Sequence, residues 1–585
     1  MSRFLLPSAP RERLAAPATA PAPARPATPA RPAARAANGV AAAATAAAGL
    51  AVRDAPHLGD IKGAFGTVRA DAHDQPASWG RRLRCLLAIM GPGLIVMFGD
   101  NDAGGVSTYA QAGQDYGTRL LWVLALLIPV LVINQEMVVR LGAVTGVGHA
   151  RLIIERFGKF WGAFSVGDLF VLNFLTITTE FIGVSLALRY FGISPYVSVP
   201  VTGVLLIAIT ASGSFARWER AIFLFIAASL VLYPLALLSE PHWGSIAYHL
   251  VVPGIQGGAT STAILLIIAI VGTTVAPWQL FFQQSNVIDK RITPRFIGYE
   301  RADTALGSIV VVAGAIAIEI VAVYAVRGTN LVGKFTDALG VARALEAHGY
   351  ALGALFAIVL LDASIIGASA VTLSTSYAFG DVFGIKHSLH RRFKDAKPFY
   401  ASYTAMIAVA AGIVLIPGAP LGLLTTAVQA LAGVLLPSAS VFLLLLCNDP
   451  EVLGPWANKR WLNIVAGVII GVLLTLSATL VVGTIFPNLN VLEVAAVAAI
   501  ALVVGGGGTG LWLEINQRRS GRTRPVPVRT TMTEQERTNW RMPPLALLKP
   551  VVWSPATRLA MILLRGYLVV SVVLLIVKAI ELGSG

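Results

Sequence analysis

Long apolar segments alternate with short polar ones along the chain from about residue 86 onward. A transmembrane helix needs about 20 consecutive, mostly apolar residues. Segments of roughly that length predict thirteen spans, at 86–113, 119–142, 161–190, 196–212, 220–239, 260–287, 303–326, 350–380, 398–416, 422–447, 461–485, 489–513 and 557–581. A long basic loop sets the last one apart, and we interpret it as an accessory helix. The pattern predicts an all-α polytopic membrane protein.

The distribution of charge agrees with this prediction and gives the helices a direction. Only 13% of the 585 residues are charged, about half the share in a typical soluble domain. Basic residues gather in the N-terminal tail and in alternate loops, for example Lys386, Arg391, Arg392, Lys394 and Lys397 after the eighth span. Because basic loops stay cytoplasmic, we expect a cytoplasmic N-terminus. The net charge of +15 then reflects orientation, and no nucleic-acid partner is expected.

The segment before the first span has a different composition. Residues 1–78 are rich in Ala, Pro and Arg and contain no apolar run long enough to cross a bilayer. Such a composition buries too little apolar surface to fold alone. We expect a disordered cytoplasmic tail, with an organellar transit peptide as the alternative for an Arg-rich, acid-poor leader.

The first span loses its apolar character near mid-depth. The stretch Gly91–Gly105 begins as an apolar helix and then presents Asp100, Asn101 and Asp102 before an Ala-Gly-Gly run. A carboxylate inside a bilayer is costly unless it faces a cavity or a cation. Glycine favours an unwound backbone, whose freed carbonyls need partners. The stretch therefore predicts a helix break that forms an intramembrane cation site.

A second interruption lies five spans later, at Val271–Gln279. Pro277 has no N–H to donate and pushes the preceding residue out of helical geometry. A lone proline would be explained as a kink. Two interrupted helices in corresponding positions of two five-helix halves, however, are typical of an inverted-repeat transporter with its site at mid-membrane. Because five is an odd number, the two halves have opposite orientations.

These features divide the chain after the tail into five parts. We expect the first inverted repeat at 79–240 and the second at 241–450. Accessory helices at 451–514, a basic cytoplasmic loop at 515–556 and a C-terminal helix at 557–585 should follow.

The first break supplies the charged ligand of the predicted site. Successive helical residues point about 100° apart, so Asp100 and Asp102 can face one point only where the helix unwinds. We predict Asp102 as the ligand. Asp100 and Asn101 lie beside it and could line the vestibule or cap a half-helix.

The second break and the tenth span supply neutral oxygens. From the break we predict contributions from the Thr274 hydroxyl, the Val275 and Ala276 carbonyls and the Gln279 amide. Gln429 would add an amide from the tenth span. The alternative for Gln429 is a structural hydrogen bond between helices, which is a common role of intramembrane glutamine.

The predicted ligands select for a hard cation. No Cys, Met or His stands at either break, and the two cysteines of the chain, Cys85 and Cys447, lie at predicted helix ends. Oxygen ligands favour Mg²⁺, Ca²⁺ or Mn²⁺ over softer metals. Small residues such as Gly105 and Ala276 leave room for water, which Mg²⁺ gives up reluctantly. The residues alone predict a divalent cation that keeps part of its water.

Other charged residues within the spans have simpler explanations. Glu136 and Arg140 lie one helical turn apart and predict a structural pair. Glu180, Glu319 and Asp362 could act as relay or gate residues, or could each face a basic partner or a water-lined cavity.

Several motifs follow one another in an order that matches one family. They are Gly91-Pro92-Gly93 with Asp102-Ala103-Gly104-Gly105, Gln135–Gly142 with Thr145-Gly146, Glu180–Gly183, the spacing from Gln429 to Pro437, and Cys447-Asn448-Asp449. In this order they resemble the Nramp family of divalent-metal transporters, over about residues 88 to 480. The resemblance implies a leucine-transporter-type fold with two inverted five-helix repeats, to which the C-terminal helices are added.

The chain departs from the family pattern where the family grips its metal. Gly105 stands at the position of a metal-binding Asn, Ala276 and Trp278 stand at those of Met and His, and Ile177 stands at that of a proton-route Asp. Of the polar set, three residues remain: Asp102, Glu180 and Gln429. These losses resemble the Nramp-related magnesium transporter branch, which is understood to carry Mg²⁺ and Mn²⁺ without proton coupling.

The resulting hypothesis is an alternating-access transporter for uptake of Mg²⁺ and Mn²⁺ as a partly hydrated ion, in a bacterial inner membrane. Trp278 would close one side of the site, and Glu180 is a relay candidate. We expect no cofactor, and no partner beyond the ion and the bilayer. The rivals are a proton-coupled Mn²⁺ importer, a sodium-coupled organic-solute symporter and, without any motif to support it, an intramembrane enzyme.

Overall fold

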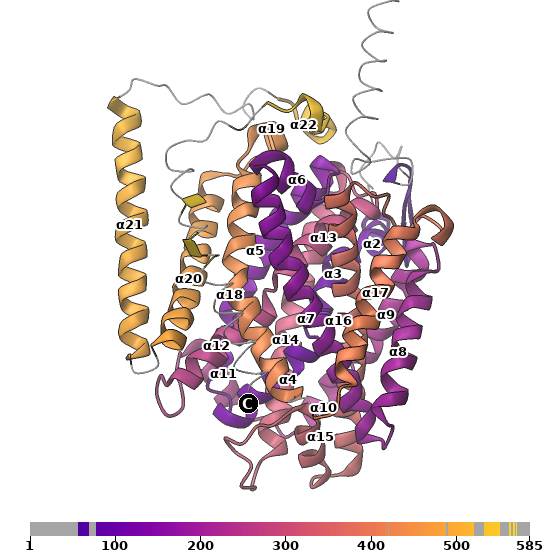
Figure 1. Cartoon of the computed structure of the whole chain (residues 1–585), viewed down its shortest axis with the longest axis vertical. Helices are drawn as coiled ribbons and strands as arrows, with labels where there is room; N and C mark the ends of the chain where they lie inside the picture. The colour runs from indigo at the N-terminus through magenta and orange to yellow at the C-terminus, as the bar shows by residue number, and fades with distance from the viewer. Residues whose placement is uncertain are drawn as a thin grey trace, which may run out of the picture. The chain divides into compact units, whose positions relative to one another are not determined.

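The computed structural model describes residues 57–69, 78–418, 421–486, 489–519 and 532–549, with a few isolated residues after 550. Within them two short strands form a hairpin and the other regular elements are helices (Figure 1). The strands are β1 (Ile61–Gly63) and β2 (Gly66–Val68). The helices are α2 (Trp79–Ile89), α3 (Pro92–Phe98), α4 (Ala103–Tyr116), α5 (Leu121–Thr145), α6 (His149–Phe157), α7 (Lys159–Tyr190), α8 (Pro195–Thr210), α9 (Phe215–Ser229), α10 (Leu232–Leu238), α11 (Trp243–Val251), α12 (Ser261–Thr274), α13 (Pro277–Asp289), α14 (Ile297–Ala325), α15 (Ala338–Glu346), α16 (Tyr350–Phe383), α17 (Lys397–Val414), α18 (Leu421–Cys447), α19 (Pro450–Leu453), α20 (Arg460–Ile485), α21 (Val491–Arg519) and α22 (Glu534–Asn539).

The helices lie where the apolar pattern predicts them, which confirms the all-α class. Among the described residues, eight helices are long and apolar enough to cross a membrane: Leu121–Thr145, Lys159–Tyr190, Phe215–Leu238, Ser261–Asp289, Pro294–Ala325, Tyr350–Phe383, Leu421–Cys447 and Arg460–Gly483. Two shorter apolar helices are Pro195–Thr210 and Val491–Gly505. The predicted span 86–113 is divided among α2, α3 and α4. Most of the predicted span 557–581 lies outside the described residues.

The prediction of a disordered tail is wrong for residues 57–68, which contain the β1–β2 hairpin. The hairpin packs against α2 and α9. An isolated two-stranded hairpin is at best marginally stable in water, so these helices must order it. The composition of the tail gives no indication that α2 and α9 present a surface on which the hairpin can pack.

The two broken helices cross in opposite directions. The first half of one packs against the second half of the other, since α3 contacts α13 and α4 contacts α12. Two inverted repeats produce this antiparallel pairing. In Figure 1, α3 and α13 lie toward one end of the bundle and α4 and α12 toward the other. Both unwound segments therefore meet inside the protein.

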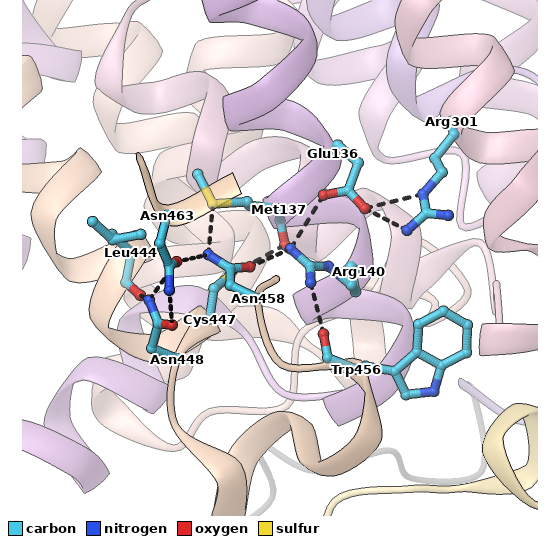
Figure 2. A network of polar contacts seen from close by, with 10 residues as sticks. All are labelled: Glu136, Met137, Arg140, Arg301, Leu444, Cys447, Asn448, Trp456, Asn458 and Asn463. Carbon is cyan, nitrogen blue, oxygen red and sulfur yellow. Dashed lines mark hydrogen bonds and ion pairs between the residues drawn. The ribbon is translucent and has the colours of Figure 1, made fainter. Parts of the chain in front are cut away.

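A polar network connects the C-terminal part of α5 to α14 and to the segment after α18 (Figure 2). Arg140 donates to the Trp456 carbonyl at 2.6 Å, to the Asn458 side chain at 2.6 Å and to Glu136 at 3.2 Å. The ion pair with Glu136 confirms the pair predicted from their spacing. Glu136 also pairs with Arg301 of α14 at 2.5 Å. The network therefore joins α5, α14 and the segment that follows α18.

We expect an Arg140→Leu substitution to destabilise the folded protein. The Trp456 carbonyl and the Asn458 side chain lose their donor, and a buried acceptor left without a partner costs about 1–3 kcal/mol. Thermal unfolding in detergent should show a Tm lower by several degrees. Arg301→Leu is the matched control, because the Arg301 side chain is 43% exposed and exposed pairs contribute about 1 kcal/mol or less. Equal Tm shifts for the two variants would contradict the assignment.

Candidate metal site

The first break lies between α3 and α4. The N–H of Gly99 donates to the Ile95 carbonyl at 2.9 Å, and the next helix begins at Ala103. Asp102 caps that helix, with an extended backbone and a carboxylate that accepts from the Gly105 N–H at 2.7 Å. Such a cap satisfies one of the free N–H groups at a helix start. The break predicted in the first span is confirmed, and Asp102 lies at its α4 side.

The second break consists of Val275 and Ala276. Both residues leave helical geometry, with φ and ψ of −130° and 67° for Val275 and −78° and 145° for Ala276. Pro277 then begins α13 and has no N–H with which to continue the hydrogen bonds of α12. Carbonyls at the end of α12 become available to other groups: that of Thr274 accepts from the Gln279 side chain at 3.3 Å. The predicted break in the sixth span is confirmed.

The side chain of Gln279 connects the two breaks. Its amide nitrogen donates to Oδ1 of Asp100, and its carbonyl oxygen accepts from Gln135 of α5 at 2.9 Å. All three side chains are buried. Gln279 is neutral, so this hydrogen bond does not offset the charge of an ionised Asp100. An ionised Asp100 at this break would therefore still need a cation or a proton to neutralise its buried charge.

Asp102 faces a second carboxyl group, that of Glu180 on α7. Oε2 of Glu180 accepts from the Ala103 N–H at 3.1 Å, and the two carboxyl groups are close enough to interact directly. Gly367 of α16 makes room for both, because a Cβ there would lie 2.6 Å from Glu180 Oε2 and 2.7 Å from Asp102 Cβ. Two buried carboxylates this close repel each other, so a proton or a cation near them is favourable.

Two more polar side chains approach the start of α4. The Gln429 amide of α18 packs so closely on Gly104 that a Cβ there would collide with it. The Thr273 hydroxyl lies 3.4 Å from the Cβ position of Gly105. That same Cβ would lie 2.8 Å from the Asp100 carbonyl oxygen. Any side chain at Gly105 would have to displace the unwound backbone, so this position offers the site only main-chain groups.

Unpaired polar atoms gather around the two breaks. Buried atoms without a hydrogen-bond partner among the described residues include Asp100 Oδ2, Glu180 Oε1, Thr273 Oγ1, Gln135 Oε1 and Gln429 Nε2. Buried polar atoms are nearly always paired, so the four oxygens among these atoms suit a cation, whereas the Gln429 nitrogen can donate to a water or to a carbonyl. No three His, Cys, Asp or Glu side chains within the described ranges form a group that could hold a metal. Amides, hydroxyls and carbonyls would have to complete the coordination.

Two predicted residues occupy distinct places. Asn101 lies apart from the others, because its side chain donates to the Val311 carbonyl of α14 at 3.1 Å. Trp278 is buried against the end of α3, with its ring 3.1 Å from the Cβ position of Gly99. Its carbonyl accepts from the Ser374 hydroxyl at 3.0 Å. Trp278 therefore covers the α3 side of the site, and its role as a gate stays a prediction.

The sequence prediction missed three residues at the site. Tyr109 shares a hydrogen bond of 2.7 Å with the Thr274 hydroxyl, which already donates to the Ile270 carbonyl at 2.7 Å. Thr273, rather than Thr274, presents the unpaired hydroxyl. Gln135 holds Gln279 in place. Thr273 could have been found from its position beside the break, whereas Tyr109 and Gln135 are brought to the site by packing.

A family model described as natural resistance-associated macrophage protein-like (Nramp) matches residues 93–483. The divalent metal cation transporter MntH of Burkholderia ambifaria is 28% identical over 432 residues, which cover 71% of this chain and 93% of the relative. The Bacillus subtilis protein of the same name is 27% identical over 432 residues, which cover 69% and 94%.

A solved structure shows the same architecture. The manganese transporter of Eremococcus coleocola aligns with a TM-score of 0.55 at 20% sequence identity, over 76% of this chain and 97% of that one. At this identity the likeness concerns the fold alone. It confirms the predicted leucine-transporter-type fold.

Proposed function

The chain belongs to the Nramp family, and on that premise we propose that it is a secondary transporter that takes up Mg²⁺, and also Mn²⁺, as a partly hydrated ion. Members of this family are membrane transporters and not enzymes. The relatives are named divalent metal cation transporters, which favours a metal over the organic solute of the sodium-coupled rival. We further propose a cytoplasmic N-terminus and a bacterial inner membrane as its location.

One observation carries the choice of ion. Unpaired buried oxygens surround the breaks, while Gly105 and Ala276 contribute no side-chain ligand. A bare transition metal would need more direct ligands, and softer ones, than this site offers. Mg²⁺ keeps several waters and binds through one or two carboxylates. Asp102 would supply the charge, and the Val275 and Ala276 carbonyls, the unpaired Thr273 hydroxyl and the Gln429 amide would bind the ion or its waters. The polar groups of Thr274 and Gln279 are already hydrogen-bonded, so these two residues would shape the site without binding the ion directly.

The two broken helices support alternating access as the transport mechanism. In alternating access, half-helices on either side of a mid-membrane site move so that the site opens to one side at a time. Here α3 and α13 lie on one side of the breaks and α4 and α12 on the other. The membrane potential, worth about 2.3 kcal/mol per charge per 100 mV, would drive a divalent cation inward without a coupled proton.

A second candidate has an observation in its favour. The contact between Asp102 and Glu180 could hold a proton in the absence of metal and release it when metal binds. A proton-coupled Mn²⁺ importer would use such a pair. Ile177 and Trp278 argue against it, because neither can carry a proton along the route that the family uses.

Uptake into liposomes that contain a pH reporter separates the two candidates. We expect Mg²⁺ to enter through the purified protein, and Mn²⁺ to enter and compete with it, while the internal pH stays constant. Acidification of the lumen in step with uptake would favour the proton-coupled candidate. Entry of Mn²⁺ with strict exclusion of Mg²⁺ would overturn the proposed function.

A further inference from the structure

The N-terminal hairpin, defined here as residues 57–68, lies outside the region that matches the family model, which begins at residue 93. Its turn, Ala64-Phe65, joins β1 and β2 in the register Ile61↔Val68. In Figure 1 the strands lie beside α2, at the end of the bundle where α3 begins.

The tip of the hairpin binds a buried ion pair. The Ala64 N–H donates to Glu219 Oε2 at 2.5 Å, and the Ala64 carbonyl accepts from Arg220 Nε at 3.1 Å. The other carboxylate oxygen of Glu219 pairs with Lys290 at 2.6 Å, and both of these side chains are fully buried. Lys290 also donates to the Met90 carbonyl at 2.7 Å. The hairpin therefore completes a chain of contacts from α9 through the end of α13 to Met90, at the junction of α2 and α3.

The start of α3 is also hydrogen-bonded to α14. Asp303 Oδ2 of α14 accepts from the Gly91 N–H at 3.0 Å and from the Gly93 N–H at 2.7 Å. These are free donors at a helix N-terminus, where a carboxylate is favourable. Two half-helices of the transport site, α3 and α13, are thus held together at the end that the hairpin covers.

A second group of contacts anchors the start of the hairpin to the end of α13. His57 lies 3.6 Å from Asp289, and the Asp60 carbonyl accepts from Arg291 at 3.1 Å. Ile61 is 1% exposed. The hairpin cannot stay bound in this way if α13 moves relative to α9 and α2.

We infer that the N-terminal hairpin is a latch that holds this end of the transporter closed. Alternating access requires α3 and α13 to separate from their neighbours at one stage. The latch binds the closed arrangement and loses its binding surface in the open one, so it must slow opening at this end. Releasing it should raise both the opening of α2 and α3 and the rate of transport.

Gly63→Leu in the full chain tests the latch. Gly63 packs directly on the Ala88 carbonyl, so a Cβ there would collide with α2 backbone and would also lie 3.2 Å from Lys290 Nζ. The substitution should lift the hairpin without touching the transport site. Thr67→Leu is the matched control, since Thr67 is an exposed residue of the same hairpin.

Two readouts keep opening separate from ion chemistry. The first is the initial rate of Mg²⁺ or Mn²⁺ uptake into liposomes. The second is the rate at which a maleimide modifies Cys85 in a Cys447→Ser background, where it is the one remaining cysteine of the two. Cys85 is a buried residue of α2, the helix that the hairpin covers, so its modification reports the release of α2 whatever ion is carried. The uptake rate shows whether that release speeds opening; faster labelling with unchanged uptake would overturn the inference.

We expect Gly63→Leu to raise the Cys85 labelling rate about tenfold and the uptake rate severalfold over Thr67→Leu. Arg220→Ala, which removes one donor to Ala64, should act in the same direction with a smaller change. The inference is overturned if Gly63→Leu and Arg220→Ala label like the control. Slower uptake with unchanged labelling would also overturn it, because the hairpin would then have only a structural role.

Discussion

Asp102→Ala will reduce metal uptake at least about 100-fold, because it removes the carboxylate that we propose as the charged ligand of the cation. The loss of one partner from a buried charge pair costs about 3–5 kcal/mol, and each 1.4 kcal/mol corresponds to a factor of ten. The measurement is the initial rate of Mg²⁺ and Mn²⁺ uptake into liposomes at saturating metal, with protein content matched between variants.

Alanine at position 102 also removes the cap of α4, so a second variant must separate charge from folding. Asn caps helices about as well as Asp, and Asp102→Asn can still accept from the Gly105 N–H. We expect it to fold normally and to fail to transport. Asp115→Asn changes a half-buried carboxylate at the far end of α4 and should retain uptake. Substantial uptake by Asp102→Asn would show that the charge of Asp102 does not bind the ion.

Asn101 lies beside the proposed ligand but bonds elsewhere. The sequence places it between two carboxylates, which makes it a candidate ligand. In the structure its amide bonds to Val311 of α14, because unwinding turns neighbouring side chains in different directions. We expect Asn101→Ala to lower uptake less than about threefold, consistent with a lost neutral hydrogen bond of about 1 kcal/mol or less. A loss as large as that of Asp102→Asn would place Asn101 at the ion.

The positions of the breaks could be predicted from sequence because they depend on local chemistry. Pro277 cannot continue a helix, and acidic residues followed by Gly104 and Gly105 are poorly suited to a helix in lipid. The antiparallel crossing also followed, since the second break lies five spans after the first and five is an odd number. These inferences need only the properties of residues close together in the chain.

The hydrogen bonds among distant side chains could not be predicted in the same way. Tyr109 forms a hydrogen bond with the Thr274 hydroxyl, and Gln135 donates a hydrogen bond to Gln279, which is 144 residues away in the chain. Which polar atoms remain unpaired depends on such contacts. The same limit applies to the N-terminal hairpin, which is ordered by α2 and α9 and not by its own composition.

Ala276→Met will shift selectivity toward transition metals. Ala276 lies in the second break, with an extended backbone and a side chain only 4% exposed, so a longer side chain there would extend within the protein beside the unwound segment. A thioether is a soft ligand that favours Mn²⁺, Fe²⁺ and Cd²⁺ over Mg²⁺. We expect the ratio of Mn²⁺ to Mg²⁺ uptake to rise about tenfold, and Cd²⁺ to become a strong competitor, because Mg²⁺ gains nothing from sulfur.

Size must be separated from sulfur chemistry in this test, and Ala276→Leu does so. Leu has about the volume of Met and no ligand atom, so it produces the same crowding, which costs about 1–3 kcal/mol in a packed interior. Ala276→Leu should lower the uptake of both ions and leave their ratio unchanged. A matching change in ratio for Leu and Met would mean that space at the second break, and not the absence of a soft ligand, sets the preference. A ratio that neither variant alters would place the determinant with the oxygens of Asp102, Glu180 and Thr273.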